Sequence, residues 1–393
     1  RHLPSVQLGL DRAVQTGRST GSSIKPVLDY APAIQYLNWS TAKMLDDSKY
    51  VYPGTNIQLY DWDNKYDGMM TMRKALEQSR NVPAVKTLAD VGVKRASAFA
   101  RRLGVNVPAN SGLSVAIGAN ASSLQMTGAY SAFATMGIYH KPQFVSKIET
   151  PDGLTRNYDS NGVRVMKKST AYMITDMLKG VIKHGSGTNA KIPDLYQAGK
   201  TGTVKYSDED LAKYPGYNST PKDSWFVGYT RSYTIGIWTG YDNLKDGTIS
   251  GIGQQSAQLM YKSMMSYLMR NKPNLNWEQP KSVIRAKTGG TWQLYVRGHA
   301  PAGVSDSAAS YDEDDEETDT NNETNNSVNT NNTQSSSSEA GTAHQSSRVE
   351  RSQSSQSSRE QSSSSASHTQ SSRPTRNEDN EDHEQNHDDS DKD

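Results

Sequence analysis

The stretch that decides the fold is Trp225-Phe-Val-Gly-Tyr-Thr230, then Arg231-Ser232, then Tyr233-Thr-Ile-Gly-Ile-Trp-Thr-Gly-Tyr241. Both halves are rich in β-branched and aromatic residues, and only two polar residues separate them, which predicts a tight antiparallel hairpin. Residues 198–204 are a further candidate strand before it, and residues 254–269 carry a helical pattern after it. The sequence therefore predicts an antiparallel sheet that is closed by a helix.

The part of the chain before these strands is largely helical. Apolar residues recur at helical spacing over 121–136, which stops at Gly137, and over 169–184, where Ser169 is the expected N-cap and Gly185 follows the end. A shorter helix is expected to open at Ser22, and Pro32 is expected to kink or end it. Two more short strands are expected at 282–287 and 291–297. The fold class is α+β, with a helical subdomain beside the antiparallel sheet.

Composition divides the chain at residue 304. Of the 90 residues from Val304 to the end, nine are hydrophobic, and none of them is Leu, Ile, Met, Phe or Trp. Such a segment buries too little apolar surface to offset its conformational entropy, so 304–393 is predicted to be a disordered, acidic tail rich in Ser and Asn. The preceding residues carry all six tryptophans, which indicates a true core.

Charge divides at the same place. The tail has a formal charge of −15 and the body one of +16, so the total of +1 is a cancellation. A basic body suits an anionic partner such as nucleic acid, a membrane surface or an anionic wall polymer, although a merely soluble surface would look the same.

Several classes of protein are excluded. No run of about 18 apolar residues and no signal peptide is present, so no membrane span is predicted. The absence of cysteine excludes disulfide scaffolds, zinc fingers and thiol nucleophiles. The chain starts at Arg1 inside a loop-like segment, and we interpret it as a fragment whose N-terminal part, with any anchor, is missing. No Walker A loop, H-E-x-x-H or metal-ligand cluster is present, so no cofactor is expected.

The remaining candidate chemistry is a serine activated by a lysine. Ser22-x-x-Lys25 lies at an expected helix start, where the i, i+3 spacing puts both side chains on one face. Free N–H groups at a helix start can stabilise developing negative charge. The lysine can act as a base only when it is neutral, which requires burial or neighbouring cations.

Two further motifs give the first one its specificity. Ser79-x-Asn81 lies in a helical loop, and Lys200-Thr201-Gly202-Thr203 lies on the strand before the hairpin. Each motif also has chance matches, which fall outside this order and context: Ser40 to Lys43, Ser219 to Lys222, Ser327 to Asn329, and Lys287-Thr288-Gly289.

This set resembles the penicillin-recognising serine enzymes, whose motifs are S-x-x-K, S-x-N and K-T-G. The closer resemblance is to the transpeptidase domain of class A penicillin-binding proteins of Gram-positive bacteria. The segments that carry it are Gly21-Ser-Ser-Ile-Lys-Pro26, Gln78-Ser-Arg-Asn-Val-Pro-Ala84, Gly185-Ser-Gly-Thr188, Ala198-Gly-Lys-Thr-Gly-Thr203 and Trp225-Phe-Val-Gly-Tyr229.

The resemblance implies a domain organisation. Residues 1–270 would be the transpeptidase domain, 271–303 a short C-terminal extension and 304–393 the tail. The fold would be the serine transpeptidase and β-lactamase type, without its first sheet strands. The polar insert 205–223 would be a substrate-side lid or plain loop variation.

The resemblance also implies roles for the motif residues. Ser22 would be the acylated nucleophile, Lys25 its base and Ser79 a proton relay to the leaving D-Ala. Asn81 would bind the substrate amide. Lys200 would lower the pKa of Lys25 and, with Thr201, Gly202 and Thr203, form the site of the terminal carboxylate. The backbone N–H groups of Ser22 and Thr203 would be the oxyanion hole.

The implied function is a peptidoglycan D,D-transpeptidase that releases D-Ala and is acylated by β-lactams. Its partners would be stem peptides and an amine acceptor, with no nucleic acid. The membrane would be reached only through the missing N-terminal anchor, at the extracytoplasmic face of the cell membrane or in the cell wall.

Other functions stay open at this point. A serine β-lactamase would need the glutamate of an E-x-x-L-N loop, and Ile34 and Lys272 stand at the two positions where it could fall. A D,D-carboxypeptidase would use water in place of the amine. A β-lactam sensor domain would keep Ser22 and Lys25 without turnover, and a surface protein with a Ser/Asn-rich stalk would bind no penicillin.

Overall fold

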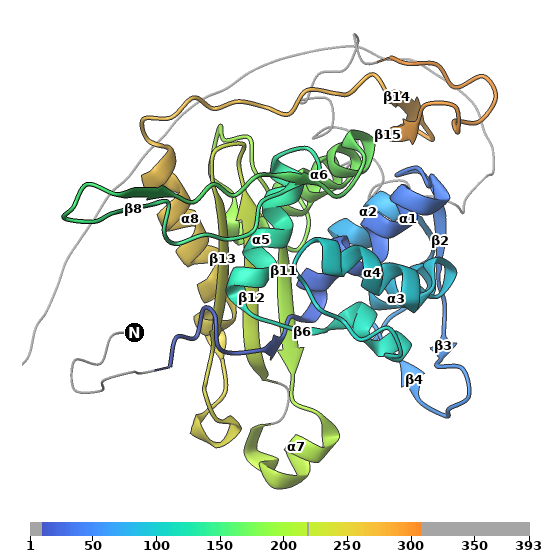
Figure 1. Cartoon of the computed structure of the whole chain (residues 1–393). Helices are drawn as coiled ribbons and strands as arrows, with labels where there is room; N and C mark the ends of the chain where they lie inside the picture. Colours follow the sequence, from blue (N-terminus) through green and yellow to red (C-terminus); the bar gives the residue numbers. More distant parts are fainter. Residues whose placement is uncertain (1–9, 218–219, 308–393) are drawn as a thin grey trace, which may run out of the picture. The chain divides into compact units, whose positions relative to one another are not determined.

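A three-stranded antiparallel sheet lies at the centre of the molecule (Figure 1). In this computed structural model, which describes residues 10–217 and 220–307, the sheet order is β11 (Ala198–Lys205), β12 (Pro221–Tyr229), β13 (Thr234–Gly240). The register pairs Tyr229 with Thr234, so the hairpin predicted from the sequence is confirmed. In the described part of the chain, β13 pairs with β12 alone.

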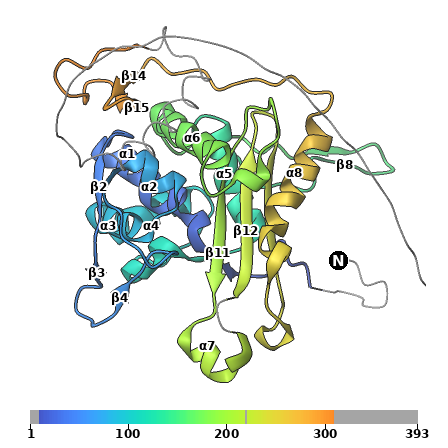
Figure 2. The same ribbon diagram turned by 180° about the vertical axis from the view of Figure 1, so that it is seen from behind.

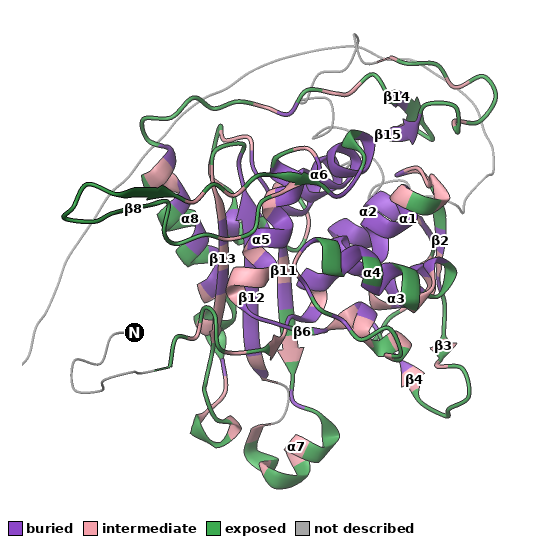
Figure 3. Ribbon diagram, viewed as in Figure 1, coloured by how far each residue is buried: buried purple, intermediate pink, exposed green. Residues whose placement is uncertain are grey.

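The two faces of the sheet pack against different helices. Trp225, Val227 and Tyr229 of β12 join the large core, whereas Phe226 joins a smaller cluster with Tyr261 of α8 (Ser256–Met269). This follows from the two-residue period of a strand. Helices α5 (Ser123–Ala134) and α6 (Lys168–Lys183) lie opposite α8, and Figure 2 shows α8 from the other side. Figure 3 shows that burial concentrates along the sheet, α6 and the helices beside them.

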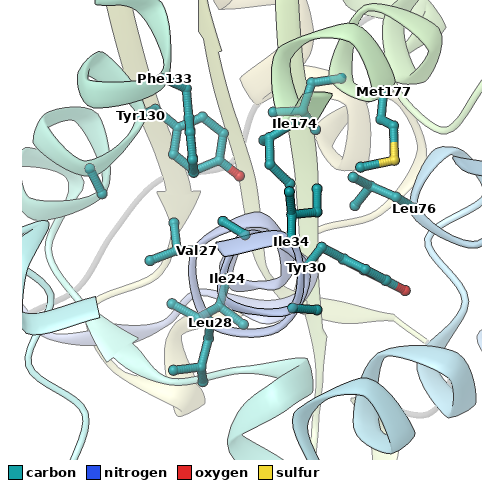
Figure 4. Packing of buried hydrophobic residues seen from close by; sticks show 14 of the residues in the cluster. Ile24, Val27, Leu28, Tyr30, Ile34, Leu76, Tyr130, Phe133, Ile174 and Met177 are labelled. Atoms are coloured by element: carbon teal, nitrogen blue, oxygen red, sulfur yellow. The ribbon is translucent and has the colours of Figure 1, made fainter. Parts of the chain in front are cut away.

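The helical segment that starts at residue 21 runs through the middle of the core (Figure 4). It consists of η1 (Gly21–Ile24), η2 (Pro26–Tyr30) and α1 (Ala31–Leu37). Pro32 was expected to kink or end this helix. The expected end is wrong, because the segment stays helical to Leu37. The hydrogen-bond register changes from 3-10 to π to α along it, and Pro26 and Pro32 each fall in the first two positions of a new register. A missing N–H is tolerated there.

The sequence placed the start of α6 slightly too late. The N-cap is Lys167, and Ser169 lies inside the first turn. The amide oxygen of Gln35, on α1, accepts from the Lys167 backbone N–H at 3.0 Å and the Thr170 hydroxyl at 2.8 Å. This contact from a distant residue replaces the local serine cap. In contrast, α5 has a local capping box between Ser122 and Gln125.

The remaining elements surround this core. On the helical side lie α2 (Met72–Glu77), α3 (Asn81–Val91), α4 (Val93–Arg102) and η3 (Leu113–Ile117). The antiparallel pairs are β1 (Arg18–Ser19) with β6 (Asn120–Ala121), β2 (Met44–Asp47) with β5 (Gly68–Thr71), β3 (Tyr50–Val51) with β4 (Gln58–Leu59), β7 (Ile138–Tyr139) with β10 (Val163–Arg164), and β8 (Lys147–Glu149) with β9 (Thr155–Asn157). The short turns are η4 (Thr188–Ala190), η6 (Leu244–Asp246) and η7 (Gly251–Gln255).

The polar insert between β11 and β12 forms a short helical excursion. It contains α7 (Asp208–Lys213) and η5 (Pro215–Tyr217), and it lies at the lower end of the sheet in Figure 1. Ser207 and Asp210 make a capping box that starts α7.

The last described segment is tied to the helical side by buried charges. It contains β14 (Val283–Thr288) and β15 (Thr291–Val296), which confirm the two short strands predicted there, and the two strands pair as a hairpin. Asp176 of α6 accepts from both Arg285 of β14 and Arg73 of α2, each at 2.5 Å. The domain boundaries expected at 270 and 303 stay predictions, and the predicted tail lies outside the described residues from 308 on. No helix within 10–217 or 220–307 is long and apolar enough to cross a membrane.

Candidate active site

Ser22 lies in the first helical turn of the central segment, directly beside β11. A Cβ added to Gly21 would lie 2.7 Å from the carbonyl oxygen of Thr203 and 2.9 Å from its nitrogen. Gly21 also has a φ of +52°, which favours glycine. The backbones of the S-x-x-K and K-T-G motifs therefore touch, because glycine occupies position 21.

Lys25, three residues after Ser22, is fully buried. Its Nζ donates to the carbonyl oxygens of Ser79 at 2.8 Å and Arg80 at 2.9 Å, and to Asn81 Oδ1 at 2.8 Å. Burial is the main cause that lowers the pKa of Lys25 from 10.5 to about 7, against the opposing charge of Asp29. The resemblance attributed this lowering to Lys200, whereas desolvation carries most of it.

The loop that carries Ser79 and Asn81 is held by the residue between them. Ser79 has a φ of 60°, an uncommon conformation for a residue with a side chain. Arg80, only 1% exposed, donates to Asp47 at 2.8 Å, Asp63 at 3.1 Å and the Lys65 carbonyl oxygen at 2.7 Å. The Arg80 guanidinium therefore holds Ser79 and Asn81, its two neighbours in the S-x-N motif, in place.

Asp61 supports the same loop from the cavity side. Its carboxylate accepts from the backbone N–H of Asn81 and lies 3.5 Å from Arg80. Burial and the adjacent Asp47 carboxyl raise the pKa of Asp61 to about 6. Asn81 Nδ2 in turn donates to the Tyr60 carbonyl oxygen at 3.0 Å, so the amide of Asn81 is held at both ends.

Replacing Arg80 by methionine is expected to destabilise the protein by about 3–5 kcal/mol, because it leaves buried carboxylates without a partner. Urea denaturation measures the loss. Lys86 pairs with Asp46 at 2.7 Å in a half-exposed place, so Lys86→Met serves as the control, with an expected loss of about 0–1 kcal/mol. Equal losses in the two variants would contradict the role given to Arg80.

Lys200 lies on β11 and is also fully buried. Its Nζ donates to Ser79 Oγ at 2.8 Å and to Thr201 Oγ1 at 3.3 Å. Burial and the nearby charge of Lys25 lower the pKa of Lys200 well below its ordinary value. Ser79 therefore contacts both lysines, one through its carbonyl oxygen and the other through its hydroxyl.

One cavity of about 930 Å³ collects the motif residues. Six of the eight predicted site residues line it: Ser22, Ser79, Asn81, Thr201, Gly202 and Thr203. Lys25 and Lys200 lie behind its wall, fully buried. The chance matches do not join them, because Lys43 and Lys287 are exposed elsewhere and the matches with Ser219 and Ser327 include residues outside the described part.

Replacing Gly202 by alanine is expected to slow acylation of Ser22, the nucleophile that the resemblance implies, by about 100-fold or more, since displacements of about 1 Å have effects of this size. The new Cβ would lie 2.2 Å from the Thr20 carbonyl oxygen, so β11 and the Ser22 turn would be forced apart. Gly216→Ala is the control, because no atom lies within 4 Å of the added Cβ. Labelling rates with a fluorescent penicillin give the comparison, and unchanged labelling of Gly202→Ala would rule out this close packing.

Sequence reasoning missed several residues of this cavity. Asp61, Trp62, His184, Ser186 and Gln258 also line it. Only Ser186 had a signal, since Gly185-Ser-Gly-Thr188 was among the segments that carried the resemblance. In the residues that the structure describes, no group of three or more His, Cys, Asp or Glu side chains could hold a metal ion.

Comparisons with known proteins agree with this geometry. A family model described as the penicillin binding protein transpeptidase domain matches residues 7–266. The chain is 45% identical over 291 residues to penicillin-binding protein 1A of Streptococcus oralis, covering 70% of this chain and 45% of that protein. It is 39% identical over 286 residues to penicillin-binding protein 1A/1B of Bacillus subtilis, covering 71% and 31%. The chain thus spans less than half the length of these relatives.

Solved structures share the fold. Penicillin-binding protein 1A from Haemophilus influenzae aligns with a TM-score of 0.62 at 22% identity, covering 75% of this chain and 50% of that one. The PonA1 protein from Mycobacterium tuberculosis in complex with penicillin V aligns with a TM-score of 0.61 at 23% identity, covering 70% and 75%.

Proposed function

Since this chain belongs to the transpeptidase family of penicillin-binding proteins, with class A relatives among Gram-positive bacteria, we propose that it cross-links peptidoglycan stem peptides through a Ser22 acyl-enzyme. The observation that carries the proposal is the cavity itself. It joins a serine, a second serine and an asparagine to the K-T-G strand, with two buried lysines behind. Acyl transfer needs such a nucleophile, base and set of donors.

In the acylation step, Ser22 Oγ attacks the carbonyl carbon of the penultimate D-Ala, and Lys25 takes the hydroxyl proton. The three acceptors around Lys25 Nζ match the three hydrogens of an ammonium. The neutral amine has two hydrogens and a lone pair. One of the three hydrogen bonds must therefore break, so that the lone pair can accept the Ser22 proton. A pKa of about 7 makes the neutral form common at neutral pH.

The leaving D-Ala nitrogen needs a proton, and in this proposal Ser79 delivers it. Its hydroxyl accepts from Lys200 and its carbonyl oxygen accepts from Lys25. A proton can therefore pass to the nitrogen through the Ser79 hydroxyl. Release of D-Ala leaves the acyl group on Ser22, which an amine acceptor then removes.

Substrate binding uses the two walls of the cavity. The amide of Asn81 would bind the substrate backbone, and Lys200 with Thr201 and Thr203 would offer donors to the terminal carboxylate. A bound carboxylate would favour the charged form of Lys200. The backbone N–H groups of Ser22 and Thr203 would hold the oxyanion. β-Lactams, which carry a carboxylate beside a strained amide, would acylate the same serine.

The location that suits this chemistry is the outer face of the cell membrane or the wall, where stem peptides occur. We propose this location from the proposed substrate and from the basic body of the chain.

Turnover of a synthetic stem pentapeptide, with and without an amine acceptor, tests the reaction. The expected result is D-Ala release together with a cross-linked product that appears only with the amine. D-Ala release without any cross-linked product would identify a carboxypeptidase instead. Rapid hydrolysis of penicillin would identify a β-lactamase. Such an enzyme would need the glutamate of an E-x-x-L-N loop, whereas this chain has the core residue Ile34 and the exposed residue Lys272 at the two candidate positions.

A further inference from the structure

Helix α4 belongs to a strongly basic part of the protein surface. Its exposed cations include Arg95, Arg101 and Arg102, and Arg164 of β10 and Lys167 and Lys168 at the start of α6 are exposed as well. We call these six residues the basic face. We propose that the basic face binds a linear phosphodiester polymer, a class of anionic wall polymer. The proposal goes beyond the reaction at Ser22, and its test does not depend on that reaction.

The end of α1 connects α4 to the start of α6. Helices α1 and α4 lie side by side (Figure 1), and the Arg95 guanidinium stacks on the Tyr36 ring, 5.8 Å from the ring centroid. Lys167 Nζ donates to the Gln35 carbonyl oxygen at 3.3 Å and to Asn38 Oδ1 at 3.4 Å. Because Gln35 and Tyr36 are adjacent in the chain, Arg95 and Lys167 belong to one surface.

A second contact joins α4 to β10. Arg102 Nη2 donates to the Arg164 carbonyl oxygen at 3.2 Å, and Arg164 Nη1 donates to the Met136 carbonyl oxygen at 2.9 Å. Arg101 and Lys168 are the chain neighbours of Arg102 and Lys167. The six cations therefore form one continuous patch across α4, β10 and the start of α6.

Acidic side chains are missing from the segments that build this patch. No Asp or Glu occurs from residue 91 to 148 or from 160 to 175. In the part of the chain that the structure describes, none of the six cations forms an ion pair with a carboxylate. Gathered like charges repel one another and attract a partner of opposite charge, so the basic face favours an anionic ligand.

A chain of phosphate groups is the ligand that suits the basic face. Arg95 and Arg101 are separated along α4 by a rise of about 9 Å, so a single small anion cannot contact both ends of the helix. Four of the six cations are arginines, whose guanidinium groups pair with phosphate oxygens at two points. A flexible polymer with repeated phosphates can reach α4, β10 and α6 together.

Nucleic acids and membrane surfaces fit the basic face less well. Single-stranded nucleic acid binds through open aromatic rings, whereas the Tyr36 ring carries Arg95 and packs edge-on against Phe99, with centroids 6.1 Å apart. A helix that binds membranes inserts large apolar side chains, and α4, all of which the structure describes, exposes none.

The experiment measures binding of labelled poly(glycerol phosphate) to the full chain by fluorescence anisotropy over a series of salt concentrations. The double variant Arg101→Gln with Lys168→Gln is expected to weaken binding about 25-fold, since each cation near an anionic surface contributes about fivefold. The slope of log Kd against log salt concentration should become shallower by about 1.4, the value for two lost contacts with a single-stranded polyanion. Penicillin labelling should stay unchanged, which reports an intact fold.

Lys262→Gln with Arg270→Gln is the matched control. It removes the same two charges from exposed positions on α8 and directly after it, so binding of the polymer should change by no more than about twofold. Equal weakening in the two double variants, or no binding by the unmodified chain, would overturn the basic face as a site.

Two further probes test the kind of ligand. Oligothymidylate with the same number of phosphates is expected to bind no more tightly than poly(glycerol phosphate), because the basic face offers no open ring for stacking. Tighter binding of the oligothymidylate would contradict the proposal and identify a nucleic-acid site. Tighter binding of a synthetic peptide of residues 308–330, an acidic segment of this chain, would contradict it as well and identify an intramolecular ligand.

Discussion

Replacing Ser22 by alanine is expected to abolish covalent labelling by a fluorescent penicillin. The Ser22 hydroxyl is the only group proposed to form the ester with penicillin, and a neighbouring base or donor cannot replace it. Labelling is read by gel fluorescence and by intact-mass measurement. The loss should be complete within detection, while the fold is kept, because Ser22 is half-buried at the cavity surface.

Ser23 provides a control of the same residue type at the next position. Its side chain is fully buried, its hydroxyl donates to the Thr20 carbonyl oxygen at 2.8 Å, and it does not line the cavity. Ser23→Ala should therefore retain labelling. An adduct on the Ser22→Ala chain, or loss of labelling in Ser23→Ala alone, would show that the nucleophile is another residue.

Replacing Lys25 by methionine or arginine is expected to slow acylation by about 10²–10⁴-fold, the usual contribution of general-base catalysis. Methionine removes the base, and arginine keeps a charge but cannot lose its proton at accessible pH. Lys43→Met is the control, since Lys43 ends a chance S-x-x-K match and is exposed beside Trp39. Its acylation rate should equal that of the unmodified chain.

The pH dependence follows from the same residue. Only neutral Lys25 can accept the proton of Ser22, and its pKa is lowered to about 7. The acylation rate should rise about tenfold per pH unit below pH 7 and level off above it. Stopped-flow labelling from pH 5 to 9 measures this limb. If Lys25→Arg kept the same limb, the titrating base would be a different group.

Much of the architecture was predictable because local patterns agreed with the final packing. The hairpin of β12 and β13 was marked by two apolar runs around Arg231-Ser232. The three motifs could be joined because the resemblance assigns a serine, a lysine and an asparagine to one site. The motifs lie far apart in the sequence, and nothing local indicates that they meet in the fold. Only the resemblance connected them.

What escaped prediction depends on contacts between distant residues. Nothing local indicates that Arg80 is buried among Asp47, Asp61 and Asp63, or that Ser79 takes a left-handed conformation. The cap of α6 by Gln35 is equally non-local. Pro32 was misjudged because its effect depends on the change of helical register before it.

The burial of Lys25 has a consequence for folding as well as for catalysis. In the unfolded chain its pKa is the ordinary 10.5, whereas in the folded protein it is about 7. Between these values the unfolded chain binds more protons than the folded one, so folding expels a proton and stability rises with pH through this window. At neutral pH the buried amine therefore opposes folding, and the rest of the core must offset it. The proposed base therefore lowers the stability of the fold at neutral pH, an example of the conflict between activity and stability that is common at functional sites.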